Sequence, residues 1–408
     1  MDVIGSVTGR LYQTGPLLAR GGEAPVYRVV GDTSILLKIF DDLPSARSVQ
    51  KLDLLTRYAS KPAHTAMPLE TVLDPASREV VGYVQPFFDR TIPLKGAMDV
   101  AGRRLLGLPN SLDFKVKVCR LLSEAVARLH AVNLVMGDVS DTNFLLGRNW
   151  IGRSTVMHVI DCNSLQLSIR TNQGHDLFAS GVATEAYTAP EVQPTDWSIS
   201  PRTIFSDSFG LAVACWLFLF NGSHPFAVAS PRNVDNPPLG ERIERRLFPY
   251  APATPLPAGW SQLTLDPSLG ILPNELREMF FRTFSTADCR DRPTADNWVT
   301  AFRSWEAKPK PRAPLRKLGS WNSPVANRLA VLLDGLKSWT GRGLVLGGIL
   351  VLALFYSRSD STSQPLPHPE PTSPAPVLNR PSPGTAPTKR GRVVDPVMFP
   401  EPIWNPQP

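Results

Sequence analysis

The sequence predicts an α+β fold built as two lobes, a mostly β lobe followed by a mostly α lobe. Two patterns carry this prediction. Between residues 10 and 90 the chain passes through short β-branched segments with one helix among them, and beyond residue 110 the apolar residues recur at helical spacing. A cleft between two such lobes is the natural place for a ligand.

The first lobe is predicted over residues 1–90. Its strands are expected at residues 26–30, 34–39, 69–73 and 80–85, and its helix at residues 45–58. Gly31 and Asp32 supply the turn between the first two of these strands.

The second lobe is predicted over residues 91–306. Its helices are expected at residues 114–133, 207–222 and 295–307. On the first of them, one face is apolar throughout and consists of Val116, Cys119, Leu122, Val126 and Leu129. This face is expected to lie in the core.

The remaining chain does not have the pattern of a third folded domain. Residues 359–408 contain 14 prolines among 50 residues and are expected to be a disordered tail. The uncharged run inside residues 342–358 predicts one transmembrane helix, although its 15 residues fall below the roughly 20 that a bilayer needs, and a buried soluble helix is the alternative. Residues 307–341 then form a basic juxtamembrane linker.

The charge distribution predicts how such a protein is oriented. Arginine and lysine are concentrated before the predicted span, which places the two lobes in the cytoplasm and the tail on the opposite side of a single-pass membrane protein. The net charge of +7 is explained by this basic linker facing anionic membrane lipid, and no zinc-finger or other nucleic-acid module is found, so nucleic acid is not an expected partner. The four cysteines lack any disulfide or metal spacing, which suits a reducing compartment.

Two positions in the first lobe could bind phosphate groups. Gly21 and Gly22 stand at a hairpin tip before Val26, where backbone N–H groups can approach a phosphate, although an ordinary hairpin turn is the better explanation of the two glycines alone. Lys38 lies on the next strand among apolar neighbours, which favours a phosphate-binding point charge over a solvated edge residue.

Three oxygen-bearing side chains follow in the second lobe. Asp138 and Asn143 lie in the stretch MGDVSDTNFLL directly after a long helix, and Asp161 ends the apolar strand VID. Each could merely cap a turn or end a strand. Together they have the spacing of one base and two ligands for a hard Mg²⁺ ion.

These motifs resemble the protein-kinase superfamily across residues 10–306. The resemblance implies that ATP is bound with Mg²⁺ or Mn²⁺ and that its terminal phosphoryl group is transferred to serine or threonine of a protein substrate. It makes Asp138 the residue that accepts the hydroxyl proton, Lys38 the contact of the α- and β-phosphates, and Asn143 and Asp161 the metal ligands. The implied nucleotide site also contains Gly21, Gly22, Val26, Gln85 and Phe87.

The resemblance extends to a segment that docks substrate and supports the second lobe. Thr184 and Glu191 occupy the stretch ATEAYTAPE, Asp207 looks like a buried aspartate that binds the catalytic loop, and Arg292 looks like the partner of Glu191. Among bacterial kinases the stretches GDVSDTNFLL and YTAPEVQ look most like the YegI-like branch. Members of that branch are linked to phosphatase and von Willebrand A-type partners, which the resemblance implies here as well.

Several positions depart from the usual kinase pattern. Met136 and Gly137 replace a His-Arg pair, and Ser140 replaces a lysine. Asn163 replaces the glycine that usually stands two residues after the aspartate at position 161. The helix of the first lobe offers only Asp53 as an acidic partner for Lys38. These departures favour a nucleotide-binding pseudokinase as the alternative. The four residues that an active kinase needs are all present, namely Lys38, Asp138, Asn143 and Asp161, so an active Ser/Thr kinase is expected, and a small-molecule phosphotransferase is a weaker alternative.

Overall fold

The structure is a computed structural model that describes residues 1–20, 24–147, 155–172, 174–229, 237–251 and 256–308. All of these residues lie in one compact unit of the chain. They form an α+β fold, as the sequence predicts.

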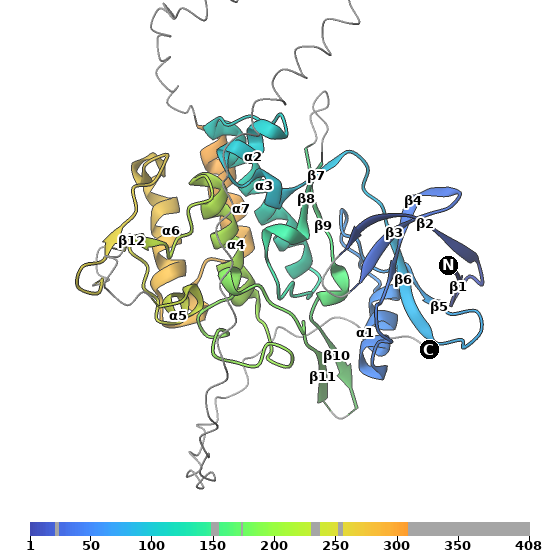
Figure 1. Ribbon diagram of the computed structural model, residues 1–408. Coiled ribbons are helices and arrows are strands. Elements are labelled where there is room, and N and C mark those ends of the chain that lie inside the picture. The colour runs from blue at the N-terminus through green and yellow to red at the C-terminus, as the bar shows by residue number, and fades with distance from the viewer. Residues whose placement is uncertain (21–23, 148–154, 173, 230–236, 252–255, 309–408) are drawn as a thin grey trace, which may run out of the picture. The chain divides into compact units, whose positions relative to one another are not determined.

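The N-terminal part is a closed barrel with the strand order β1-β2-β3-β4-β6-β5 (Figure 1). The strands are β1 Asp2–Gly5, β2 Leu11–Arg20, β3 Pro25–Val29, β4 Asp32–Ile39, β5 Glu70–Leu73 and β6 Val80–Pro86. Its apolar core consists of Val3, Tyr12, Val29, Leu37, Ile39, Val72 and Val84. This core is separate from the larger core of the helical part.

The barrel differs from the predicted lobe in two respects. β1 and β2 were not expected as distinct strands, and the barrel closes because β1 pairs with β5, where Ile4 lies opposite Leu73. The first hairpin turn is also shifted by one residue, because Asp32 already pairs with Val29 and Gly31 takes a φ of 77° in the turn.

Helix α1, Ala46–Thr56, follows β4 and lies beside the barrel in Figure 1. Ser45 caps its N-terminus by accepting a hydrogen bond from the Ser48 amide. Leu52 and Leu55 are buried, so the apolar side of the helix fixes its position.

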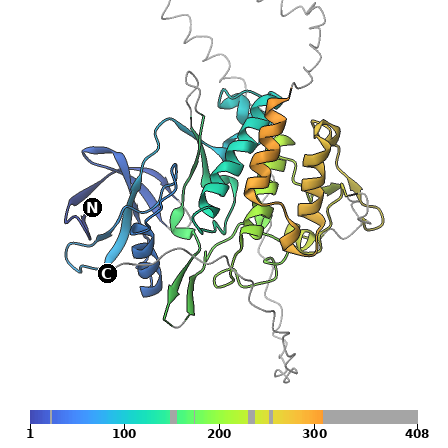
Figure 2. The same cartoon turned by 180° about the vertical axis from the view of Figure 1, so that it is seen from behind.

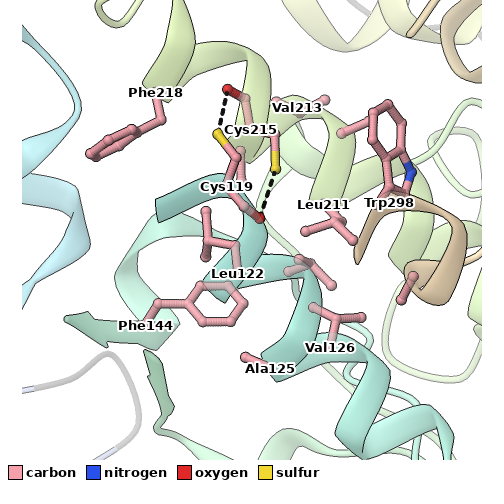
Figure 3. Packing of buried hydrophobic residues seen from close by; sticks show 14 of the residues in the cluster. Cys119, Leu122, Ala125, Val126, Phe144, Leu211, Val213, Cys215, Phe218 and Trp298 are labelled. Carbon is pink, nitrogen blue, oxygen red and sulfur yellow. Dashed lines mark hydrogen bonds between the residues drawn. The ribbon is translucent and has the colours of Figure 1, made fainter. Parts of the chain in front are cut away.

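The helical part surrounds α3, which lies alongside α7 in Figures 1 and 2. Its helices are α2 Val100–Leu105, α3 Leu112–His130, α4 Ile204–Leu219, α5 Leu239–Glu244, α6 Asn274–Ser285 and α7 Ala295–Ala307. The apolar face predicted on α3 is fully buried, and Cys119 packs against Cys215 of α4 in Figure 3. α6 was not predicted.

Short strands between these helices carry the loops that matter below. β7 Thr91–Pro93, β8 Phe144–Gly147 and β9 Met157–Val159 form one sheet, β10 Leu167–Thr171 pairs with β11 Gly174–Phe178, and β12 Val228–Ala229 pairs with β13 Ser261–Gln262. The β10–β11 pair was not predicted. It lies between the motif that contains Asp161 and the segment that contains Thr184.

No helix within the described ranges is long and apolar enough to cross a bilayer. The predicted span at residues 342–358, the tail at 359–408 and nearly all of the linker at 307–341 lie outside these ranges. The predicted domain boundaries therefore remain predictions.

Candidate active site

Lys38 reaches the site from the C-terminal end of β4, where it pairs across the sheet with Val26 of β3 and Tyr83 of β6. The residue is only 6% exposed. Its Nζ atom forms a salt bridge with Asp161 and donates a second hydrogen bond, 2.8 Å long, to Asn163 Oδ1. The ammonium group is thus held by two residues of the turn that follows β9.

Asp161 stands at a sharp change in chain direction after β9. Its backbone has φ 61° and ψ 40°, a left-handed conformation that is uncommon outside glycine, and such outliers concentrate at functional sites. The 3₁₀ turn Cys162–Ser164 follows, and the Ser164 hydroxyl donates to the Asp161 carbonyl at 2.8 Å. The turn therefore fixes the backbone at Asp161, and the salt bridge to Lys38 holds its carboxylate.

The loop that carries Asp138 is held by hydrogen bonds to Asp207 of α4. The Asp207 carboxylate accepts hydrogen bonds from the amides of Met136 at 2.6 Å and Gly137 at 2.8 Å, and His130 Nε2 lies 2.9 Å from it. Asp207 is 2% exposed, so these charge-assisted bonds are shielded from water. They hold the loop at the two residues before Asp138.

Gly137 is required at this point of the loop. Its φ is +76°, and an added Cβ atom would lie 2.5 Å from the Ser180 side chain. Any larger residue would push the loop away from Ser180. Position 137 is therefore determined by packing, where the usual kinase pattern has an arginine.

The Asp138 carboxylate lies between two further sequence-predicted residues. Its Oδ1 atom accepts from the Thr184 amide at 3.1 Å, and its Oδ2 atom accepts from the Thr184 hydroxyl at 3.2 Å and from Asn143 Nδ2 at 3.1 Å. Asn143 Nδ2 also donates to the Asp138 carbonyl at 3.0 Å. The catalytic-loop and docking motifs thus meet at one carboxylate.

Burial raises the pKa of Asp138 above its ordinary value, and the nearby negative charge of Asp161 raises it further. The hydrogen bonds from Thr184 and Asn143 act in the opposite direction without cancelling the effect of burial. A carboxylate with a raised pKa is a better proton acceptor than an exposed aspartate.

Asn143 and Asp161 are linked through the backbone, because the Ile160 amide donates to the Asn143 carbonyl at 3.0 Å. Both residues carry oxygen donors, which are the ligands that Mg²⁺ prefers. Two protein ligands are also a usual number for Mg²⁺ that is held together with phosphate groups. The residues present therefore fit such an ion.

The predicted nucleotide-binding residues differ in what the structure shows of them. Gln85 on β6 is buried, and its side-chain oxygen has no hydrogen-bond partner within the described ranges, which leaves an acceptor for a ligand. Phe87 packs its ring under the Arg28 guanidinium at 3.7 Å, which gives it a structural contact in the first lobe. Gly21 and Gly22 lie outside the described residues.

Glu191 and Arg292 form a bidentate ion pair with N–O distances of 2.6 and 2.7 Å. The Arg292 side chain is completely buried and also donates to the Phe205 carbonyl at 3.2 Å. This pair joins the docking segment to the turn that precedes α7.

Two residues beside Lys38 were not singled out by sequence reasoning. In the sequence, Asn163 stands out only as the residue that replaces a glycine of the kinase pattern, and Tyr83 only as part of a strand. In the structure, the Tyr83 hydroxyl donates to Asn163 Oδ1 at 2.7 Å. The available signal was an asparagine two residues after the aspartate that is predicted to bind the metal. Asp53 instead pairs with Arg57 on the exposed side of α1, at 2.9 Å.

Comparison with known proteins bears on this arrangement. Two curated proteins match the chain at 28% identity over 304 residues, which is 73% of this chain. Both carry the name protein kinase YegI, one from Escherichia coli strain K12 and one from Escherichia coli O157:H7. The chain is protein-kinase-like. The resemblance to protein kinases, and to the YegI-like kinases among them, is thereby confirmed.

The chain covers about half of these protein kinases, 45% of their length. No family model matches it. The similarity supports a kinase-like phosphotransferase function for the chain.

Proposed function

We propose that the chain is an ATP- and Mg²⁺-dependent protein kinase that phosphorylates serine or threonine. The observation that carries the proposal is the grouping of Asp138, Asn143 and Thr184 by direct hydrogen bonds, with Asn143 joined through Ile160 to the motif that contains Asp161. Asp161 in turn binds Lys38. Base, metal ligands and phosphate-binding cation thus form one connected set.

In this proposal each residue has one task. Lys38 binds the α- and β-phosphates through its ammonium group. Asp138 orients the acceptor hydroxyl and accepts its proton while the hydroxyl oxygen bonds to the γ-phosphorus and the bond to the β-phosphate oxygen breaks, which releases ADP. Asn143 and Asp161 would hold Mg²⁺, which neutralises phosphate charge when it is bound.

A protein rather than a small molecule is the proposed acceptor. Thr184 contacts Asp138 directly, and the segment from Thr184 to Glu191 is held at its far end by Arg292, so the proposed catalytic carboxylate adjoins a segment that is fixed at both ends. The test is to incubate the full chain with ATP, Mg²⁺ and mixed protein substrates and to identify the modified residues by mass spectrometry. Phosphoserine or phosphothreonine is expected. Phosphorylation of sugars or amine alcohols alone would instead identify a small-molecule phosphotransferase.

One observation favours a second candidate, a nucleotide-binding pseudokinase. Ser140 stands where many kinases have a lysine, it is completely buried, and its hydroxyl bonds to the Thr142 hydroxyl at 2.7 Å. No cation can act on the transferring phosphoryl group from this position, and loss of such stabilisation can lower a rate by about 10²–10³. ATP binding without any transfer would support this candidate.

We also propose that the protein is anchored in a membrane by residues 342–358, with its two lobes on the cytoplasmic side. Support comes from the uncharged run and from the basic residues before it. The full chain is expected in the membrane fraction of cells, and a chain that ends at Pro311 in the soluble fraction. Equal solubility of the two would contradict the anchor.

A further inference from the structure

Lys38 meets a neutral amide where the usual kinase pattern leads one to expect a second carboxylate. Within the described ranges its hydrogen-bond acceptors are Asp161 and Asn163 Oδ1, the latter at 2.8 Å. A buried ammonium group is costly unless its donors are paired. The amide oxygen is therefore part of what keeps Lys38 in place.

Tyr83 determines the orientation of that amide. Its hydroxyl donates to the same Oδ1 atom at 2.7 Å, the residue is completely buried, and its ring centre lies 5.9 Å from Lys38 Nζ. An ammonium group can only donate hydrogen bonds, so the Asn163 atom that faces Lys38 must be the oxygen. Tyr83 and Lys38 are also neighbours across β6 and β4, which places both donors on one side of Asn163.

Helix α1 offers no acidic partner for Lys38. Asp53 is the acidic residue in its sequence, and it pairs with Arg57 on the exposed side. The helix is instead attached by cations to the segment around β11: Arg47 binds Asp176 at 2.8 and 2.5 Å, and Lys51 donates to the Ala179 carbonyl at 2.8 Å. The side chains that attach α1 are therefore positively charged, and a positive side chain cannot pair with the Lys38 ammonium group.

We propose that Asn163, held by Tyr83, is the positioning residue for Lys38 and takes the place of an acidic residue on α1. The inference rests on the proposed function, because Lys38 is assigned there to the phosphates of ATP. The turn after β9 then supplies both anchors of Lys38, so this lysine stays engaged independently of the position of α1.

The test compares the affinity of full-length variants for ATP, ADP and adenosine by calorimetry. Asn163→Leu removes the acceptor at nearly constant size, and Tyr83→Phe removes the donor that orients it. Both are expected to weaken ATP and ADP binding, by about tenfold for Asn163→Leu, the size of one hydrogen bond to a charged group, and to change adenosine binding less than about twofold. Asn163→Asp keeps an acceptor and is expected to stay within about threefold of wild type.

A merely structural role would weaken all three ligands together, which separates it from positioning. Tyr12→Phe is the matched control, because it removes another buried tyrosine hydroxyl of the same barrel, which donates to Glu70 at 2.5 Å. Wild-type affinity for ATP in both Asn163→Leu and Tyr83→Phe would overturn the inference and leave the proposed function standing. Absence of ATP binding by the wild type would overturn both.

Discussion

Thr184 donates two hydrogen bonds to Asp138, one from its amide and one from its hydroxyl, across 46 residues of chain. Each bond goes to a different oxygen of the carboxylate. A change in the position of Thr184 therefore acts directly on the proposed base.

Removing only the hydroxyl bond tests this coupling. Thr184→Val keeps the backbone amide bond and the size of the side chain, so kcat is expected to fall about tenfold while the KM for ATP changes little. Thr184→Ser should retain most activity. Thr300→Val, which removes an exposed hydroxyl on α7, is the matched control. A kcat for Thr184→Val equal to that of the control would contradict the coupling.

The raised pKa of Asp138 predicts a pH dependence of stability. The folded state binds the Asp138 proton more tightly than the unfolded state, whose pKa is near the ordinary value of 3.8. The stability contributed by the protonated carboxyl is thus fully present below that value and is lost as pH rises through the folded pKa. The Tm of Asp138→Asn minus that of wild type should therefore increase over this window and then level off. A difference that is constant with pH would contradict the raised pKa.

Asp207 is expected to contribute strongly to stability. Asp207→Asn removes the charge that accepts the amides of Met136 and Gly137 and brings a donor toward them, so the free energy of unfolding should fall by about 2–4 kcal/mol in urea titrations. Asp196→Asn, an exposed residue that binds its own turn at Ser198, is the control and should change the free energy of unfolding far less. Equal effects would show that the loop is held by other contacts.

Gln85 is expected to lower the stability of the ligand-free protein, because its buried side-chain oxygen has no hydrogen-bond partner in the described part of the chain. Gln85→Leu should raise the free energy of unfolding of the ligand-free protein by about 1 kcal/mol and weaken ATP binding. Thermal unfolding with and without ATP measures both. The same change at the exposed Gln262 should do neither. Unchanged ATP affinity in Gln85→Leu would remove Gln85 from the nucleotide site.

The sequence was most informative where the signal is local. Asp138 and Asn143 lie five residues apart, and the structure joins them by a hydrogen bond. The buried face of α3 likewise follows from helical spacing alone. Such features need no knowledge of distant parts of the chain.

Two features that depend on distant pairing were missed, whereas the distant pair of Glu191 and Arg292 was expected from the family resemblance. Closure of the barrel requires β1 to pair with β5, and no local sequence pattern predicts this pairing. Asn163 and Lys38 are 125 residues apart, and an asparagine in a turn is ordinarily explained by its own backbone. Its role as an acceptor becomes visible only when β4, β6 and the turn after β9 are placed together.

Transfer of the γ-phosphoryl group is the measurement that tests the central claim most directly. The full-length wild type and Asp138→Asn are incubated with γ-labelled ATP, several protein substrates, and Mg²⁺ or Mn²⁺, and label on protein is counted. The account predicts label on serine or threonine with the wild type and a loss of about 10²-fold or more with Asp138→Asn, as expected for removal of a general base. Equal silence of the two proteins, or equal labelling by them, would contradict it.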